Sequence, residues 1–383
     1  MYKFFLYYFG DLDDKREFGK IKYDLFEVLF ISFISTLCGE DSFSGMSHFG
    51  SLQEDWFRKY LKLENGIPSH DTFRTVLNML DPKDFSNRFV KLMKDLMKAS
   101  KKTKIRDHLA IDGKSIKGSR YLDKESNKHK IIHTVNVLST NYGLSVCQRS
   151  VDGDKYTSET TAILEILNML DLKKKVISVD AGMSYKAIGE KVIEKRGNYI
   201  FAIKDNNKKT FELIKEHVRL RGFIKDEKFM YEESEKAHGR ETKRVFYSYN
   251  IPKKLSESIS FPKIKYIGVY ETYNILKNEL SDRRYFITSK KINSPEEFYR
   301  LCRNHWQVEN NLHWVLDVLY NEDSSTIKKG NAPKIILILR QLAVNLIKME
   351  KSNLSLANKK RSFIWNQKYR DKILREYVKK WAI

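Results

Sequence analysis

The chain has 383 residues, 41% of them hydrophobic, and its 71 Lys and Arg exceed its 49 Asp and Glu to give a formal net charge of +22. This composition excludes a disordered chain, and no apolar run reaches the roughly 18–20 residues of a membrane span. The cysteines Cys38, Cys147 and Cys302 are scattered, which excludes a disulfide framework and a Cys-x-x-Cys zinc site and favours a cytoplasmic protein.

Residues 1–104 are predicted to form an N-terminal helical domain. Asp24 and Ser69 suit N-caps, and Gly39 suits a helix stop. A Pro-Ser turn into a helix is compatible with a helix-turn-helix that reads DNA, although such a bundle is more often simply packing. The expected helices cover residues 25–38, about 52–62, 72–80 and 85–98.

The pattern changes near residue 105 to short aliphatic and β-branched runs, which indicate strands. Strands and helices then alternate as far as residue 204, and this alternation predicts a mixed α/β sheet covered by helices. We expect strands at 108–112, 131–138, 144–151, 175–180 and 198–204, and helices at 158–170 and 184–196.

Residues 205–262 depart from this pattern and are predicted to form an inserted subdomain. A charged helix at 208–220 is followed by two alternating runs, 228–235 and 242–250, that suggest a hairpin. Residues 263–350 are expected to complete the sheet domain, with strands near 264–272 and 283–289 and helices at 295–320 and 333–348.

A basic tail, residues 351–383, carries ten Lys or Arg and two acids, with Trp365, Tyr369, Tyr377 and Trp381 interleaved. Such a tail suits phosphate contacts with base stacking, and it equally suits an amphipathic helix docked on the body. The net charge favours a polyanionic partner, nucleic acid before an anionic membrane surface, although Lys-rich proteins are also common in AT-rich genomes.

Two acidic residues follow apolar strands directly. Asp112 closes the run at 108–111, and Asp180 closes the run at 175–179. Ligands of an open α/β sheet bind beyond its strand ends, and two carboxylates close together there repel each other unless a cation lies between them. Mg²⁺ prefers oxygen ligands, so the pair indicates a metal site; the simpler alternative is a pair of turn or helix-cap residues.

A third carboxylate would complete a two-metal site for displacement at phosphorus. Glu309 lies on a predicted helix, one turn from Trp306 and His313, so it shares a face with bulky residues. A charge there is costly without a partner, and a metal ion would be one. The rival acids Asp317, Glu322 and Asp323 lie farther along the same segment.

The order of these motifs resembles the DDE transposases of bacterial insertion sequences, in the branch that includes the H-repeat-associated proteins. The resemblance covers most of the chain, including the helical N-terminal segment. The motifs that carry it are Ala110-Ile-Asp112-Gly-Lys-Ser, Val179-Asp180-Ala, His305-Trp-Gln-Val-Glu309-Asn-x-Leu-His-Trp-x-Leu-Asp317-Val, Ile67-Pro-Ser-His-Asp-Thr-Phe73, Lys328-Lys-Gly330-Asn and Leu339-Arg-Gln-Leu-Ala-Val-Asn345-Leu.

The resemblance implies a ribonuclease-H-like fold in which Asp112, Asp180 and Glu309 form the catalytic triad. It implies that these acids bind two Mg²⁺ ions, with Mn²⁺ as a substitute. The wider family commonly has Tyr, Arg and Lys around its Glu, and those places fall here at Cys302, His305 and Leu316. The departure concerns how DNA is positioned, and the neighbouring Arg303 is a candidate for the missing cation.

The implied activity is cleavage of the ends of an insertion sequence and joining of the 3′ ends to target DNA. The implied partners are double-stranded DNA with terminal inverted repeats, target DNA and a second copy of the chain on paired ends, with association to the nucleoid and no membrane. A ribonuclease-H-like nuclease that does not join strands, and a decayed DNA-binding copy without activity, are the alternatives.

Several cations lie beside the predicted strand ends, on the hairpin tip or near Glu309, where they would contact DNA phosphates. Each is equally compatible with an ordinary surface cation. These candidates are Lys114, Lys117, Arg120, Lys204, Arg240, Arg303 and His305.

Overall fold

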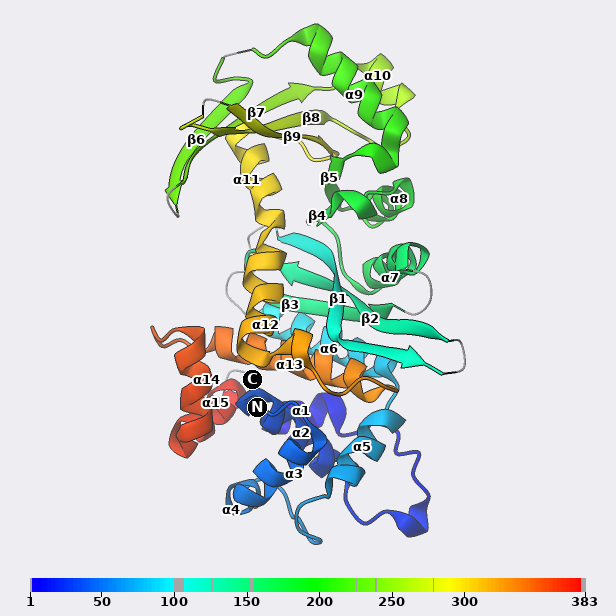
Figure 1. Cartoon of the computed structure of the whole chain (residues 1–383), viewed down its shortest axis with the longest axis vertical. Coiled ribbons are helices and arrows are strands. Elements are labelled where there is room, and N and C mark those ends of the chain that lie inside the picture. The colour runs from blue at the N-terminus through cyan, green and yellow to red at the C-terminus, as the bar shows by residue number, and fades with distance from the viewer. Residues whose placement is uncertain are drawn as a thin grey trace.

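A single nine-stranded sheet extends from the middle of the molecule to one of its ends. The computed structural model describes residues 2–99, 107–124, 127–151, 155–224, 226–237, 240–277 and 279–379. Figure 1 shows the N-terminal helices at one end of an elongated molecule, the first five strands in the middle and strands β6–β9 with α9 and α10 at the other end.

The sheet order is β3-β2-β1-β4-β5-β9-β8-β7-β6. Strand β1 pairs in parallel with β4, β4 pairs in parallel with β5, and every other neighbouring pair is antiparallel. The strands are β1 (His108–Asp123), β2 (Lys128–Ser139), β3 (Leu144–Val151), β4 (Val176–Val179), β5 (Asn198–Ile203), β6 (Met230–Ala237), β7 (Arg240–Asn250), β8 (Tyr266–Asn274) and β9 (Glu279–Thr288).

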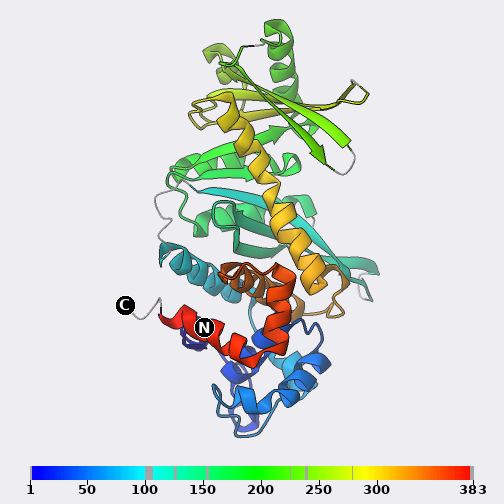
Figure 2. The same ribbon diagram turned by 90° about the vertical axis from the view of Figure 1, so that its left-hand side faces the viewer.

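Helices cover both faces of the first five strands. Helices α7 and α8 pack on one face, and α11 and α13 pack on the other, where α11 and α12 follow one another along the molecule (Figures 1 and 2). The helices are α1 (Tyr2–Phe9), α2 (Leu25–Cys38), α3 (Phe43–Leu52), α4 (Glu54–Phe57), α5 (His70–Met79), α6 (Pro82–Ala99), α7 (Lys155–Met169), α8 (Lys186–Glu194), α9 (Lys208–Arg221), α10 (Lys253–Ser258), α11 (Pro295–His305), α12 (Trp314–Tyr320), α13 (Ala332–Met349), α14 (Leu356–Trp365) and α15 (Gln367–Lys379).

Short helical turns lie between these helices and strands. Four are 3₁₀ turns, and the fifth, η4, is a π-helix between α11 and α12. They are η1 (Phe18–Lys20), η2 (Ala181–Met183), η3 (Asp205–Asn207), η4 (Glu309–His313) and η5 (Glu322–Ser324).

The period of two along β1 decides which side chains face which helices. Leu109 and Ile111 pack into the core beneath α7 and α8, whereas Ala110 packs into the core that contains α12 and α13. Asp112 continues the alternation on the side of Ala110. In β4, Ser178 likewise faces α11, where its hydroxyl oxygen lies 2.9 Å from Nδ1 of His305.

The C-terminal helices dock on the N-terminal ones. Asp371 of α15 accepts hydrogen bonds from the indole of Trp56 at 2.8 Å and from the hydroxyl of Tyr60 at 2.7 Å. The buried guanidinium of Arg370 lies over the rings of Trp56 and Phe49. The described part of the tail is therefore a docked helical pair, which is the second of the two alternatives for this segment.

Helix caps form where the sequence predicts them. Asp24 accepts from the backbone of Glu27 at 3.1 Å, Ser69 accepts from the backbone of Thr72 at 3.4 Å, and Gly39 ends α2 with φ at 101°. The predicted helix at 52–62 is wrong in extent: the helix there is the short α4 (Glu54–Phe57), and the longer α3 ends at Leu52, where the predicted helix begins. Strand β1 is longer than expected because its polar second half pairs with β2 as a hairpin.

The expected α/β class is confirmed, and the order of β3-β2-β1-β4-β5, with only β2 antiparallel to β1, is the ribonuclease-H-like arrangement. Strands β6–β9 form a continuous antiparallel meander whose last strand joins β5. The division of the chain at residues 104, 204, 262 and 350 stays a prediction. Among the described helices, none combines the length and the hydropathy needed to cross a bilayer.

Candidate metal centre at the sheet edge

Asp112 lies in the central strand β1, directly after its buried residues 108–111. Its side chain is 22% exposed, and one of its oxygens accepts from the backbone N–H of Gly113 at 2.9 Å. Burial raises the pKa of Asp112 to about 6; the nearby His313 opposes this rise, and the charge of Asp180 adds to it. A carboxyl group in this position gains most from a cation beside it.

Asp180 follows β4 directly and lies beside Asp112. Val179 pairs with Ile111 in the parallel ladder. The residues that follow them, Asp180 and Asp112, are therefore neighbours on adjacent strands. Asp180 is exposed, and its carboxylate accepts from the backbone of Gly182 at 3.4 Å, which caps η2. Asp180 is therefore both the cap of η2 and a close neighbour of the carboxylate of Asp112.

Glu309 begins the π-helix η4, which interrupts the helix predicted at 295–320. The wider turn is closed by the bond from the backbone N–H of Trp314 to the carbonyl of Glu309. The ammonium of Lys348 donates to the carbonyl of Asn311 within the same turn. π-turns occur frequently at functional sites. The Glu309 side chain is 62% exposed, and it therefore lies at the rim of the apolar face that the helical spacing predicts.

His313 joins the two acids and was not a predicted site residue. Its Nδ1 lies 2.9 Å from a carboxylate oxygen of Glu309 and 3.6 Å from one of Asp112. Ligand atoms of Asp112, Glu309 and His313 all lie within 4.8 Å of one another. The sequence signal was the four-residue spacing from Glu309, which places both side chains on one helix face.

The proton of His313 is placed by a chain of buried amides. The side-chain oxygen of Asn136 accepts from Gln341 at 2.6 Å, so the Asn136 amide group donates to Nε2 of His313 at 3.2 Å. His313 then carries its proton on Nδ1 and donates it to Glu309. This bond holds the pKa of Glu309 below its ordinary value.

Lys114 lies two residues after Asp112 and points inward. Its ammonium is 2.5 Å from Asp317 and 2.8 Å from Glu322, and its side chain is 8% exposed. The same two carboxylates raise the pKa of Lys114 against the effect of burial. A DNA phosphate could reach this ammonium only by displacing both partners.

Four of the other predicted DNA contacts are cations whose side chains the structure describes. Lys117 pairs with Asp323 at 3.4 Å on the surface, and Arg120 and Lys204 are exposed. Arg303 stacks on the ring of Trp306 at 4.8 Å. Lys204 also lines a small pocket beside Asp180 that contains Arg284, His305 and Trp306.

The remaining two candidates do not present a described cation to the surface. His305 is partly buried between α11 and β4, where burial lowers its pKa to about 4, so the imidazole is neutral near pH 7. The side chain of Arg240 lies outside the described part of the chain.

The site suits a hard divalent cation. Carboxylate oxygens are the ligands that Mg²⁺ prefers, and opposite ligands of such an ion are about 4.2 Å apart. Carboxylate oxygens of Asp112 and Glu309 lie within 4.8 Å of each other, which is close to the size of one ion site, with Asp180 beside them and His313 holding Glu309 in place. The raised pKa of Asp112 supports the fit, because burial and the neighbouring carboxylates disfavour its anion and His313 offsets them only in part.

Comparison with known proteins places this geometry in a sequence context. The family described as "Transposase DDE domain" matches residues 103–346, and the family described as "DDE_Tnp_1-associated" matches residues 6–93. The first match contains all three predicted acids, and the second lies in the N-terminal helices.

Among relatives in Escherichia coli K12, "Putative protein YbfL" is 34% identical over 346 residues, covering 89% of both chains. "H repeat-associated putative transposase YhhI" is 33% identical with the same coverage. A cryo-EM structure of the piggyBac transposase synaptic complex with hairpin DNA is a remote match, with a TM-score of 0.38, 12% identity and coverage of 95% of this chain and 76% of that one.

Proposed function

Because the chain belongs to the DDE transposase family, we propose that it cuts the ends of an insertion sequence and joins the freed 3′ ends to target DNA. The observation that carries the proposal is the group of Asp112, Glu309 and His313, formed by residues about 200 positions apart in the sequence. Asp180 is the third acid of the proposed triad. The net charge of +22 supports a polyanionic substrate.

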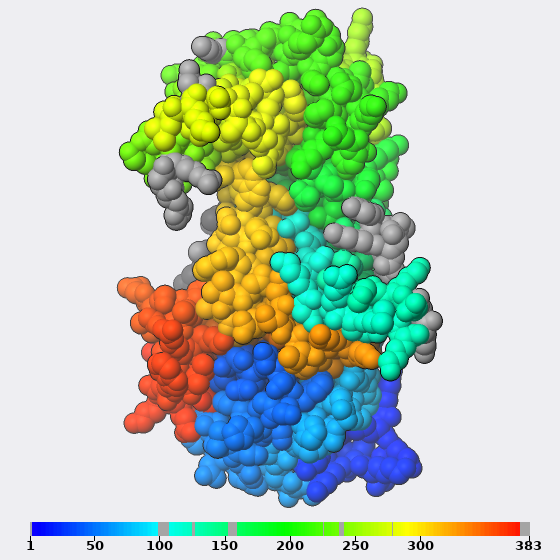
Figure 3. Space-filling model, in the orientation of Figure 1, coloured from blue at the N-terminus to red at the C-terminus, as the bar shows by residue number. Residues whose placement is uncertain are grey.

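Asp112, Asp180 and Glu309 are proposed to hold two Mg²⁺ ions, or Mn²⁺ in their place. When bound, the ions would activate water and stabilise the charge on the leaving 3′ oxygen. The role of the protein is to set the ligand positions: β1 and β4 present the two aspartates, and His313 directs the carboxylate of Glu309 toward them. Glu309 and Asp180 are exposed, which would let a DNA strand reach them, and the yellow-orange segment around residue 309 lies at the surface in Figure 3.

The proposed partners are duplex DNA with terminal inverted repeats and a second copy of the chain, so that two ends are cut together. The exposed cations Lys117, Arg120 and Lys204 are proposed to contact phosphates beside the cut, with Arg303 near the Glu309 helix. The proposed location is the nucleoid of a bacterial cell. Lys114 has a different role, because its ammonium is already paired with Asp317 and Glu322.

The test uses full-length protein with labelled DNA of the flanking element end in Mg²⁺. The variants Asp112→Asn, Asp180→Asn and Glu309→Gln should each lower the cleavage rate by at least 1,000-fold and bind the same DNA within threefold of wild type. The matched control is Glu296→Gln, which removes a half-exposed acid from α11 that pairs only with Arg300 among the described residues.

Three outcomes distinguish the alternatives. Cleavage without joining of a 3′ end to target DNA identifies a plain nuclease. Specific binding without cleavage by wild type identifies a decayed copy, and one short relative is named "Inactive transposase YbfQ". Cleavage that survives all three substitutions contradicts the triad.

A further inference from the structure

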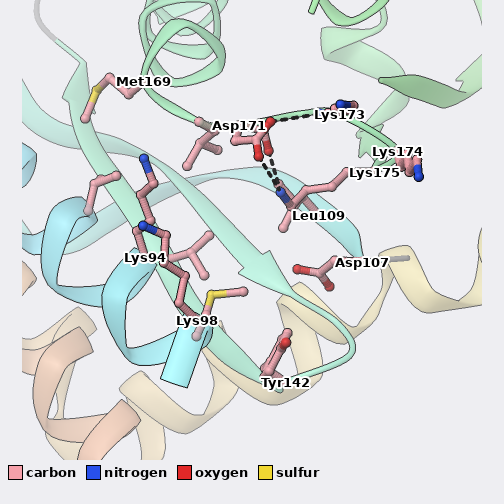
Figure 4. A pocket seen from close by; sticks show the side chains of 14 residues that line it. Lys94, Lys98, Asp107, Leu109, Tyr142, Met169, Asp171, Lys173, Lys174 and Lys175 are labelled. Atoms are coloured by element: carbon pink, nitrogen blue, oxygen red, sulfur yellow. Dashed lines mark hydrogen bonds and ion pairs between the residues drawn. The ribbon is translucent and has the colours of Figure 1, made fainter. Parts of the chain in front are cut away.

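We propose that a lysine-lined pocket at the opposite edge of the sheet binds a nucleotide, most simply a phosphorylated nucleoside of an unpaired DNA strand. The pocket has a volume of about 540 Å³ and lies between α6, the turn after β2 and the end of α7 (Figure 4). The inference depends on the proposed function only in taking DNA as the source of that nucleotide.

The pocket has two cationic walls on either side of an apolar floor. Lys94 and Lys98 stand one turn apart on α6, and three consecutive lysines, residues 173–175, form the other wall (Figure 4). Tyr142 and aliphatic or thioether side chains line the space between the walls. These floor residues are Val90, Met97, Leu109, Tyr142, Val146, Met169 and Leu170.

The charge of the pocket is not cancelled from within. Five lysines and two aspartates line it, which leaves a formal charge of +3. Asp107 is buried and accepts from the Ser139 hydroxyl at 2.8 Å. The carboxylate of Asp171 lies 4.0 Å from the ammonium of Lys175, which donates to the backbone carbonyl of Asp171 at 2.5 Å. Lys94 and Lys173 are exposed, and no ion pair of either is found within the described part of the chain.

Size and shape favour a single nucleotide unit over a duplex. A volume of this order is typical of small-molecule sites, and a duplex could only lie across the rim without reaching the floor. Unpaired strands are bound by grooves that combine cations for the phosphates with aromatic and apolar surfaces for the bases. Lysines on both walls with Tyr142 below them match that combination.

The pocket is distinct from the metal centre. Asp107, Leu109 and Lys175 mark the amino ends of β1 and β4, whereas Asp112 and Asp180 come directly after Ile111 and Val179, the last residues that the two strands pair in parallel. The four paired residues between them span about 13 Å. A strand held in the pocket would therefore leave the carboxylates free.

The experiment measures binding in the Asp112→Asn background, so that a failure of the cleavage chemistry cannot affect the result. Fluorescence anisotropy follows an unpaired eight-residue oligothymidylate, a duplex of the same length and competition by free thymidine monophosphate. The test variant is Lys94→Glu with Lys173→Glu. The matched control is Lys253→Glu with Lys254→Glu on α10, which changes the net charge equally at exposed positions.

We expect the test variant to bind the unpaired strand at least tenfold more weakly than the control and to lower the slope of log affinity against log salt by about 1. Tyr142→Ala should weaken binding roughly five- to 100-fold without changing that slope, and Tyr142→Phe should retain it. Competition by the free nucleotide would assign the pocket to a nucleotide ligand; its absence would assign it to a DNA strand, and both support the proposal.

Two results would overturn it. Equal losses in the test and control variants would mean that only the overall charge matters. Equal losses for duplex and unpaired DNA, with both Tyr142 variants neutral, would mean that the lysines only touch a duplex at the surface.

Discussion

The carboxyl group of Asp112 is costly to ionise in this fold, because burial and the charges of Asp180 and Glu309 all disfavour the anion. Its pKa of about 6 lies above that of a free aspartate, so the folded state is favoured by protonation and is less stable once the pH rises through about 6. The same group gains most from a bound cation.

The variant Asp112→Asn is therefore expected to unfold at higher urea concentration than wild type at pH 8, in the absence of divalent ions. The gain should be about 1–3 kcal/mol and should shrink as the pH falls to 5, where the wild-type carboxyl is already neutral. Urea unfolding at both pH values measures it. A wild-type protein that is more stable than the variant at pH 8 would contradict the assignment.

His313 is a second residue with a testable role, since its Nδ1–H bond orients Glu309. His313→Leu should weaken Mn²⁺ binding about 10- to 100-fold. His313→Gln should recover part of the loss, because its amide can donate to Glu309 while an amide nitrogen is a poor metal ligand. Electron paramagnetic resonance of Mn²⁺ measures both, and an unchanged affinity in the leucine variant would exclude a positioning role.

Strand β1 and the helix that contains η4 and α12 match in spacing. Two residues along a strand cover about 6.6 Å, and four residues along a helix cover about 6 Å. Asp112 consequently faces His313, and Lys114 faces Asp317 one step farther along both elements. This register fixes the distance between the acid on the strand and the acid on the helix.

Loss of Lys114 should lower the free energy of unfolding, because the contact between β1 and α12 depends on it. Lys114→Met leaves Glu322, whose side chain is 1% exposed, without its cation, and should cost about 3–5 kcal/mol in the free energy of unfolding. Adding Glu322→Gln should restore much of that stability. As a control, Lys20→Met breaks the exposed pair with Glu17 and should cost less than about 1 kcal/mol.

The elements that sequence reasoning located well are those whose signal is local. The cap at Asp24, the stop at Gly39 and the end of β4 before Asp180 are read from single residues beside apolar runs, whereas β1 continues past Asp112 because its polar half pairs with β2. The π-turn at Glu309 was not predictable, because it depends on contacts such as that of Lys348, which comes from α13. His313 and Lys114 acquire their roles from partners distant in the sequence.

At the scale of the whole molecule, sequence pattern predicted the α/β class but not how the ends of the chain meet. The tail was compatible with a DNA-contacting arm or a docked helix, since basic and aromatic residues suit both. The choice depended on Trp56 and Tyr60, more than 300 residues away, which supply the donors for Asp371. No local pattern carries that information.

Asp371→Ala should accordingly destabilise the helical end of the molecule. It leaves the buried indole of Trp56 and the hydroxyl of Tyr60 without their acceptor, at a cost of about 1–3 kcal/mol for each group. Thermal unfolding followed by tryptophan fluorescence should show a lower midpoint. Asp371→Asn, which keeps an acceptor, should lose less; equal losses would mean that the charge rather than the hydrogen bonds matters.

The bond between Trp56 and Asp371 also has a consequence for synthesis. A ribosome adds about 5–20 residues per second, so the 315 residues between them take roughly 15–60 s to translate. Throughout that interval the aromatic surface of the first helices emerges without its cover. The nascent chain should therefore depend on chaperones. Polypeptides truncated before residue 371 should be insoluble.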